Sequence, residues 1–235
     1  DVDVPGFTAQ LKVPDVRGEQ GVRGFDEVGV DVVVWLRHGG AIEAHLQLKP
    51  DGRDLEGFCR GLRAPNGFGT YGPDDDLFIA DNQGNWVGSC KLNHLQRGRF
   101  YAYPSGTPAP KAEYARPTQF APPALWFPRK LSASTSGFVT VEDDRLGPFK
   151  GQMLIGDFQN AVVMRVFLEK VNGEWQGAVW PFAKGFLSGV NRLVMGPDGK
   201  LYVGGLKNAA WAASAPKDYS LDRVSFTGKT PFDAK

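Results

Sequence analysis

Short runs of apolar residues, many alternating with polar ones, recur along almost the whole chain. They are rich in β-branched and aromatic residues and are bounded by Gly, Pro, Asp and Asn, which is typical of β-strands. No long segment repeats its apolar residues at the 3.6-residue period of a helix. The pattern predicts an all-β fold with clear strands at Val30 to Leu36, Ile42 to Leu48, Leu77 to Ala80, Gln152 to Gly156, Val162 to Leu168, Trp175 to Phe182, Leu193 to Met195, Leu201 to Val203 and Leu221 to Phe226.

Two turns indicate how these strands are connected. Lys49 to Gly52 and Gly196 to Gly199 both contain Pro-Asp-Gly, in which Pro fixes φ and Asp-Gly adopts the less common backbone angles of a tight turn. Each turn lies between two strand signals. Their recurrence predicts repeated meanders rather than a Greek key.

The strands group into about four blade-like units, near residues 26–62, 63–104, 136–184 and 189–228. Repeated four-stranded sheets around an axis are the arrangement of a β-propeller. Residues 104–130 contain seven prolines and cannot form a central strand, because Pro removes donors from the sheet. We expect a long crossing loop there. Residues 1–40 carry no clear assignment.

Composition and charge narrow the classes of function. A chain of 235 residues suits one all-β domain, and we expect residues 1–235 to form a single propeller domain. The 27 basic and 26 acidic residues nearly balance, which disfavours a nucleic acid partner. No apolar run is long enough to span a membrane. The start lacks a signal-peptide pattern, so the sequence is read as cytoplasmic or as a mature, processed form.

Several motifs resemble those of a known family. Gly-Leu-Arg-Ala-Pro-Asn-Gly begins at Gly61, Asp-Asn-Gln-Gly-Asn-Trp occupies residues 81–86, and Gly-Pro-Asp-Gly-Lys-Leu-Tyr begins at Gly196. The pattern over residues 45–232 resembles the glucose and sorbosone dehydrogenases, which are quinone-dependent β-propellers. More narrowly, it resembles a secreted branch that carries the Asp-Asn-Gln-Gly-Asn-Trp loop. The resemblance therefore favours a secreted or periplasmic protein.

The resemblance implies six blades, whereas about four are readable here. Either the chain is a partial propeller, whose missing blades come from elsewhere or from a partner chain, or residues 1–40 supply more of the fold.

The resemblance also implies cofactor roles for particular residues. Arg63 and Arg192 match positions that bind the quinone PQQ, and Gln159 lies near the position of the family's quinone-binding lysine. Gln83, Gly84 and Asn85 match a segment that gives backbone oxygens to a structural Ca²⁺. The sequence departs from the family at Ala64, Val190 and Gln159, where it lacks an asparagine, an arginine and the lysine respectively.

Loops at one end of a propeller converge on its central channel, so polar residues distant in sequence can form one site. We expect amides, charged groups and one aromatic residue there to bind a carbohydrate or another polyhydroxylated ligand. These substrate-site candidates are Asp81, Asn82, Trp86, Lys91, Asn93 and Asn191, with Asn66 and Gln176 as further polar candidates. An Asx-turn is the alternative for Asp81 and Asn82, and a structural role in or beside a strand is the alternative for Gln176 and Asn191.

The family's catalytic base is a histidine of an early blade, and no histidine here has a matching context. His94 is the weak candidate for a base, with an ordinary loop histidine as the alternative reading. We predict an oxidoreductase-like propeller that oxidises a sugar hydroxyl with a quinone acceptor. The alternative is a non-catalytic carbohydrate-binding or assembly module that kept the fold without the base.

Cysteine and tryptophan give two further expectations. Cys59 and Cys90 form either one disulfide, if the protein is exported, or two buried thiols. The tryptophans other than Trp86 are expected to pack between blades, because aromatic side chains bury a large area. They are Trp35, Trp126, Trp175, Trp180 and Trp211.

Overall fold

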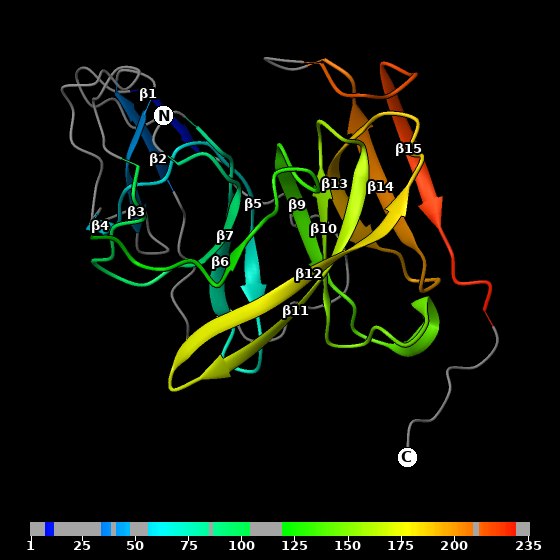
Figure 1. Cartoon of the computed structure of the whole chain (residues 1–235), viewed down its shortest axis with the longest axis horizontal. Coiled ribbons are helices and arrows are strands. Elements are labelled where there is room, and N and C mark those ends of the chain that lie inside the picture. Colours follow the sequence, from blue (N-terminus) through cyan, green and yellow to red (C-terminus); the bar gives the residue numbers. More distant parts are fainter. Residues whose placement is uncertain are drawn as a thin grey trace. The chain divides into compact units, whose positions relative to one another are not determined.

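The computed structural model of the chain describes residues 8–11, 34–38, 41–47, 56–84, 87–103, 119–208 and 212–228. The regular elements of this part are β-strands, apart from one 3-10 helix, η1 (Asp144–Leu146) (Figure 1). The all-β prediction is therefore confirmed. The chain divides into two compact units, of which the first comprises Asp1–Ala64 and Gln96–Ala121 and the second Pro65–Leu95 and Pro122–Lys235. The single-domain organisation stays a prediction.

The first unit contains one antiparallel sheet in the order β1-β2-β3-β4. Its strands are β1 (Thr8–Leu11), β2 (Val34–His38), β3 (Ala41–Gln47) and β4 (Glu56–Cys59). Each strand pairs with the next one along the chain, so the sheet is a simple meander. The predicted turn at Lys49 to Gly52 lies outside the described residues.

The second unit contains three more antiparallel sheets, each again in chain order. The first has β5 (Pro65–Tyr71), β6 (Asp76–Asp81), β7 (Lys91–His94) and β8 (Leu125–Trp126). The second has β9 (Thr135–Thr140), β10 (Met153–Asp157), β11 (Val162–Val171) and β12 (Glu174–Lys184). The third has β13 (Gly189–Met195), β14 (Leu201–Leu206) and β15 (Tyr219–Val224).

These sheets confirm the predicted meanders. The limits agree for the last two predicted units, near 136–184 and 189–228, whereas the first sheet begins at Thr8 and the second extends to Trp126, outside the predicted 26–62 and 63–104. The turn at Gly196 to Gly199 joins β13 to β14 and is closed by a 2.9 Å hydrogen bond from the Gly199 amide to the Gly196 carbonyl. Within the Pro-rich segment, residues 119–124 form no regular element and Leu125–Trp126 form the short outer strand β8. An edge position is where a Pro-rich segment can still join a sheet.

The three sheets of the second unit pack on one another with their first strands together. β5 packs against β9, and β9 packs against β13 (Figure 1). Small residues permit this close approach: a Cβ on Gly67 of β5 would meet the carbonyl oxygen of Ser136 of β9. Sheets that repeat in this way, with first strands side by side, have the arrangement of propeller blades.

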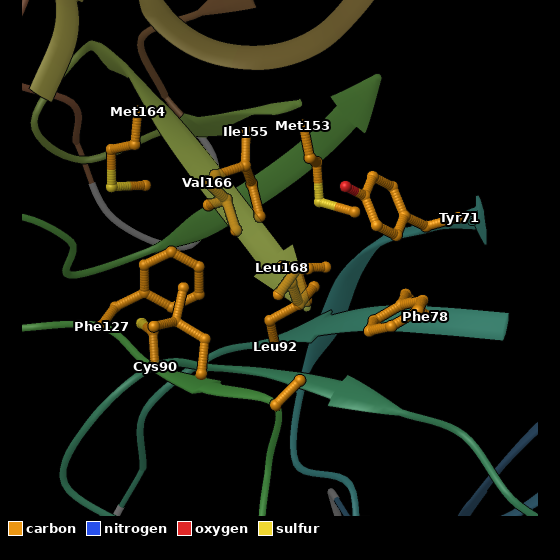
Figure 2. Close-up of a cluster of buried hydrophobic side chains, with 13 residues drawn as sticks. Tyr71, Phe78, Cys90, Leu92, Phe127, Met153, Ile155, Met164, Val166 and Leu168 are labelled. Carbon is orange, nitrogen blue, oxygen red and sulfur yellow. The ribbon is translucent and has the colours of Figure 1, made fainter. Parts of the chain in front are cut away.

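Two hydrophobic clusters fill the spaces between these sheets. One lies between β5–β8 and β9–β12, and Figure 2 shows Phe78 and Leu92 of the first sheet together with Ile155 and Val166 of the second. The other lies between β9–β12 and β13–β15 and includes Leu154, Val163, Leu201 and Val203. Each sheet therefore presents an apolar face to its neighbour, as sheet-on-sheet packing requires.

The prediction that the tryptophans pack between blades holds for Trp175. Its ring packs against the first cluster and makes edge-to-face contacts with Tyr71 and Phe78. Its indole Nε1 donates to Asp76 Oδ2 over 2.7 Å, so the one polar atom of the ring is also satisfied. Trp175 therefore joins the first two sheets of the second unit through both apolar and polar contacts.

The same prediction is wrong for Trp126 and Trp180, which are each 42% exposed. Trp180 lies under the guanidinium of Arg165, 5.0 Å from the ring centroid. A tryptophan in a strand can use its ring as a cation–π partner at the surface as readily as in the core. Trp211 and the side chain of Trp35 lie outside the described part of the chain.

Candidate functional site

The three sheets of the second unit share one end at which polar residues gather. At this end β5, β9 and β13 begin and β6, β10 and β14 finish. Two hydrogen bonds join the sheets there, from Thr135 Oγ1 to Asn82 Oδ1 (3.0 Å) and from Ser136 Oγ to the Val190 carbonyl (2.7 Å). We call this the site end. It brings together residues from positions 66 to 192 of the sequence.

Arg192 is the most prominent charged group at the site end. Its Nη1 donates to Asn66 Oδ1 (2.9 Å) and to the carbonyl (2.8 Å) and Oδ1 (3.2 Å) of Asn191. Asn66 Nδ2 also donates to Asn191 Oδ1 over 3.2 Å. Asn66 belongs to β5 and Asn191 to β13, so these bonds span the beginnings of the first and third sheets.

The rest of the Arg192 guanidinium is available to a ligand. Within the described part of the chain, its Nε and second Nη donate no hydrogen bond. The side chain is exposed. Desolvation lowers the pKa of Arg192, but an arginine stays charged at neutral pH. One nitrogen of the planar guanidinium is held in place, and the other two can donate to a carboxylate or to a pair of hydroxyls.

Asp81 and Lys91 form a buried ion pair at the same end of the first sheet. Their Oδ2 and Nζ atoms are 3.7 Å apart, and the side chains are 1% and 2% exposed. Burial lowers the pKa of Lys91, and the charge of Asp81 opposes that shift. The two residues are directly paired across β6 and β7. Each charge of the pair is balanced by the other, since an unpaired charge in the interior would be costly.

The loop after β6 is held against the segment that precedes β9. Asn82 is buried and accepts the Thr135 hydroxyl, while Gln83 Nε2 donates to the Ala133 carbonyl over 3.2 Å. The Gly84 amide donates to the Val87 carbonyl over 2.7 Å, which closes the loop. Asn85 and Trp86 lie outside the described residues. In the described part of the chain, no group of three His, Cys, Asp or Glu residues could hold a metal ion.

Asp157 organises the neighbouring loop of the second sheet and was not singled out by the sequence. Its fully buried carboxylate accepts bonds from Ser132 Oγ (2.7 Å) and the amides of Ala133 (2.9 Å), Ser134 (2.7 Å) and Asn160 (2.7 Å). The available signal was the acidic residue placed directly after the apolar strand Gln152 to Gly156. Gln159 follows in the next turn, where its carbonyl accepts the Ser214 amide over 2.7 Å.

Other predicted site residues lie elsewhere. His94 ends β7, at the opposite end of the first sheet from Asp81. Its ring stacks on Phe78, with centroids 5.4 Å apart, and its Nε2 is 3.4 Å from Asp76 Oδ1. Asn93 is fully buried on β7, and neither of its amide atoms has a hydrogen-bond partner in the described part of the chain.

Two further candidates are separate from this group. Arg63 belongs to the first unit, so its association with the site end stays a prediction. Gln176 lies on β12, where its Nε2 donates to Glu169 Oε1 of the neighbouring strand over 2.7 Å. This bond gives Gln176 a cross-strand role in the second sheet. Among the described residues no helix is long and apolar enough to span a membrane.

Comparison with known proteins agrees with this architecture. A glucose dehydrogenase-type oxidoreductase from Thermus thermophilus superposes with a TM-score of 0.58 and 18% identity over 83% of this chain. The PQQ-bound aldose sugar dehydrogenase of Streptomyces coelicolor gives 0.57 and 16% over 83%. The chain has the fold of the sugar dehydrogenase-like β-propellers.

The likeness covers only part of those proteins. The soluble aldose sugar dehydrogenase of Escherichia coli, in its apo form, gives a TM-score of 0.54 and 18% identity over 69% of this chain. The present chain spans 62%, 51% and 59% of the Thermus, Escherichia and Streptomyces chains respectively. No family model and no curated protein matches the sequence. The family resemblance noted in the sequence is confirmed at the level of the fold.

Proposed function

We propose that this propeller acts on carbohydrates, oxidising a sugar hydroxyl with a quinone as the acceptor. The observation that carries the proposal is the geometry of Arg192. Asn66 and Asn191 hold one nitrogen of its guanidinium at the site end, and the remaining donors are open to a ligand. A fixed planar fork suits recognition of a carboxylate, and PQQ carries three.

The residues at the site end fit one carboxylate of the quinone better than all three. Arg192 is an exposed cation there, whereas Lys91 is buried and already paired with Asp81. We propose that Arg63 supplies a second cation and that Gln159 offers an uncharged amide. The side-chain amides of Asn66 and Asn191 would also contact the ligand, since amides form hydrogen bonds with both hydroxyls and carbonyls.

Calcium is proposed at the loop after β6, bound by backbone oxygens of Gln83, Gly84 and Asn85. The observation that supports this placement is the folding of the loop. Asn82 is bonded to the first residue of β9 and Gln83 to the segment before it, and the hydrogen bond from Gly84 to Val87 closes the loop. Carbonyl oxygens on a fixed loop are ligands that Ca²⁺ accepts.

In the oxidation, the C–H bond of the sugar carbinol gives a hydride and the hydroxyl gives a proton. Bound PQQ would supply the two-electron acceptor, since a hydride together with one proton converts the quinone to the quinol. The chain must orient the hydroxyl and supply a base for its proton. Asp81, Asn82 and Lys91 are buried, so we propose that they hold the loops beneath the site while Asn191 and Trp86 contact the sugar.

Quinone binding tests the proposal directly. Equilibrium dialysis of the whole chain with PQQ and Ca²⁺ should show saturable binding, and Arg192→Gln should weaken it by about ten- to hundredfold because a charge-assisted pair is lost. Arg129→Gln, which removes another exposed arginine, is the matched control and should leave the affinity unchanged. Dye reduction by the loaded protein with a panel of aldoses then tests oxidation. Absence of PQQ binding would exclude the quinone proposal.

The alternative is a non-catalytic carbohydrate-binding or assembly module, and one observation favours it. His94 lies at the opposite end of its sheet from Asp81, in contact with Asp76 and Phe78 rather than with the site end. A protein of this kind would bind sugars without reducing any dye. Sugar binding by calorimetry, with no oxidation in the presence of PQQ and Ca²⁺, would identify the module.

The resemblance to the secreted branch supports our proposal of a secreted or periplasmic location. Blades beyond those described, from a partner chain or from further sequence, would complete the ring around the site end. The length of the matched structures relative to this chain supports that part of the proposal.

A further inference from the structure

Among the described residues, the third sheet of the second unit ends on a strand with one unpaired edge. Its order is β13-β14-β15, and β15 pairs with β14 only within the described part of the chain. The other three sheets each have four strands. An open edge presents unpaired backbone donors and acceptors to any strand that can match it.

The side chains of β15 make this edge unusually apolar on one face. Tyr219 is 81% exposed and Leu221 is 75% exposed, and both alternate with the more covered Ser220 and Asp222. Because alternate residues of a strand share a face, Arg223 lies on the same face as Tyr219 and Leu221. Proteins usually protect such edges with charges, bulges or a covering segment.

We propose that β15 pairs antiparallel with β15 of a second copy of this chain, about a two-fold axis centred on Leu221. Two sheets of three strands would then form one continuous sheet of six. An interface of this kind is isologous, since each residue pair occurs twice. It lies on the outermost strand, whereas Asn66 and Asn191 of the site end lie on the first strands β5 and β13.

The centre on Leu221 gives a compatible pair at each position from Tyr219 to Arg223. Leu221 lies opposite Leu221 of the second copy, and Tyr219 lies opposite Arg223, whose guanidinium can stack on the ring. On the other face Ser220 lies opposite Asp222. Within one chain Ser220 Oγ already donates to Asp222 Oδ2 over 2.6 Å, so this hydroxyl and carboxylate are compatible neighbours.

The adjacent centres are less favourable because they place like charges together. A centre on Asp222 puts that carboxylate opposite itself, and a centre on Ser220 puts Asp218 opposite Asp222. Like charges directly opposite in a sheet are destabilising. The sequence of β15 therefore favours the register centred on Leu221 over its neighbours. Because this strand is complementary to itself in that register, a second copy fits the edge better than an unrelated strand.

Cysteine substitution tests both the contact and its register. Leu221→Cys should give a disulfide-linked dimer under mild oxidation, because directly opposed strand residues lie within disulfide range. Arg223→Cys is the matched control on the same face of the same strand. Its sulfur would lie about 14 Å from the equivalent sulfur of the second copy, four residues away along the strands, and should not cross-link. The native Cys59 and Cys90 are buried and should not interfere.

Sedimentation equilibrium of the unmodified chain gives a second measurement. We expect a reversible dimer that Leu221→Lys weakens by about tenfold or more, because it places two ammonium groups opposite each other. Val194→Lys changes an exposed residue of β13 and should leave the dimer intact. Leu221 is exposed, so its variants should fold, and circular dichroism checks this. A chain that stays monomeric up to high protein concentration, or equal cross-linking of both cysteine variants, would overturn the proposal.

Discussion

At the scale of single residues, the buried polar groups do most to fix the loops of the site end. Asp157 accepts bonds from one hydroxyl and three backbone amides, of which the Ser132 hydroxyl and the Ser134 amide are buried. Asn82 bridges two sheets through Thr135. Such groups stabilise a structure chiefly because removing one partner leaves the other unpaired.

Asp157→Ala should lower the free energy of unfolding by about 3 kcal/mol or more, since several buried donors lose their acceptor together. Asp157→Asn should fall between this variant and the unmodified chain, because an amide keeps one acceptor oxygen. Urea denaturation measures both. The control is Asp218→Ala at an exposed aspartate, which should change stability by no more than about 0.5 kcal/mol. Equal stability of the Asp157 and Asp218 variants would contradict the role given to Asp157.

His94 should make stability depend on pH. Burial lowers its pKa, and the charge of Asp76 opposes this without reversing it. The folded chain therefore binds the proton more weakly than the unfolded chain, so stability is full above the ordinary histidine pKa of about 6.5 and falls as the pH drops below it. The other charged groups acting on His94 are Lys170 and Glu174.

Urea denaturation at a series of pH values from about 7 to about 5 measures this effect. His94→Gln, which keeps polar atoms but does not titrate, should show a smaller loss of stability over that range. Identical pH dependence in both proteins would rule out His94 as the source. The pKa of Asp76 is itself lowered. The stability that Asp76 contributes is therefore lost only at a more acidic pH than the stability linked to His94.

At the scale of elements, the strands that the sequence predicted are those with continuous or alternating apolar residues. Val162 to Leu168 and Trp175 to Phe182 correspond to β11 and β12, although both strands extend beyond the predicted limits. The first strands β5 and β9 were not predicted as strands. They are rich in Gly, Ser and Thr because they lie against the next sheet's first strand, where larger side chains have no room.

Gly67→Ala tests this explanation for the missed strands. The added methyl would meet the Ser136 carbonyl oxygen of β9, which is backbone and cannot move aside. We expect a loss of about 1–3 kcal/mol, as for other overpacked sites. Gly88→Ala is the matched control, because a Cβ there meets no atom within 4 Å and the residue does not adopt a positive φ. Thermal unfolding of the two variants should separate them clearly, and equal melting temperatures would show that the first strands are not tightly packed.

At the scale of the whole molecule, the sequence predicted the architecture better than the site. The repeated meanders follow from turn residues and strand signals, and both of these can be recognised from residues close together in the sequence. The group of Asn66, Asn191 and Arg192 joins residues up to 126 positions apart, and a single sequence carries no signal of that contact. Arg192 itself was found through the family motif before Gly-Pro-Asp-Gly. Asp157 was missed because an acidic residue directly after a strand has the same sequence pattern whether it is buried or lies in an exposed turn.

The two cysteines provide a test that reports on the chain as a whole. Both are free thiols in the structure, with Cys59 on β4 of the first unit and Cys90 in the second. Burial raises the pKa of the Cys59 thiol to about 12 and also raises that of Cys90. The thiolate is the reactive form, so both burial and protonation should protect these groups in the folded protein.

We expect the folded chain to react very slowly with a thiol reagent such as Ellman's reagent at mildly alkaline pH. In guanidinium chloride, without any reductant, both thiols should react rapidly and in full. The folded rate should then rise with denaturant in parallel with unfolding, because reaction requires that each unit opens. A disulfide between Cys59 and Cys90, the alternative that the sequence left open, would instead leave no reactive thiol in the denatured chain until a reductant is added. Rapid reaction of one thiol in the folded state would show that its unit opens independently of the other.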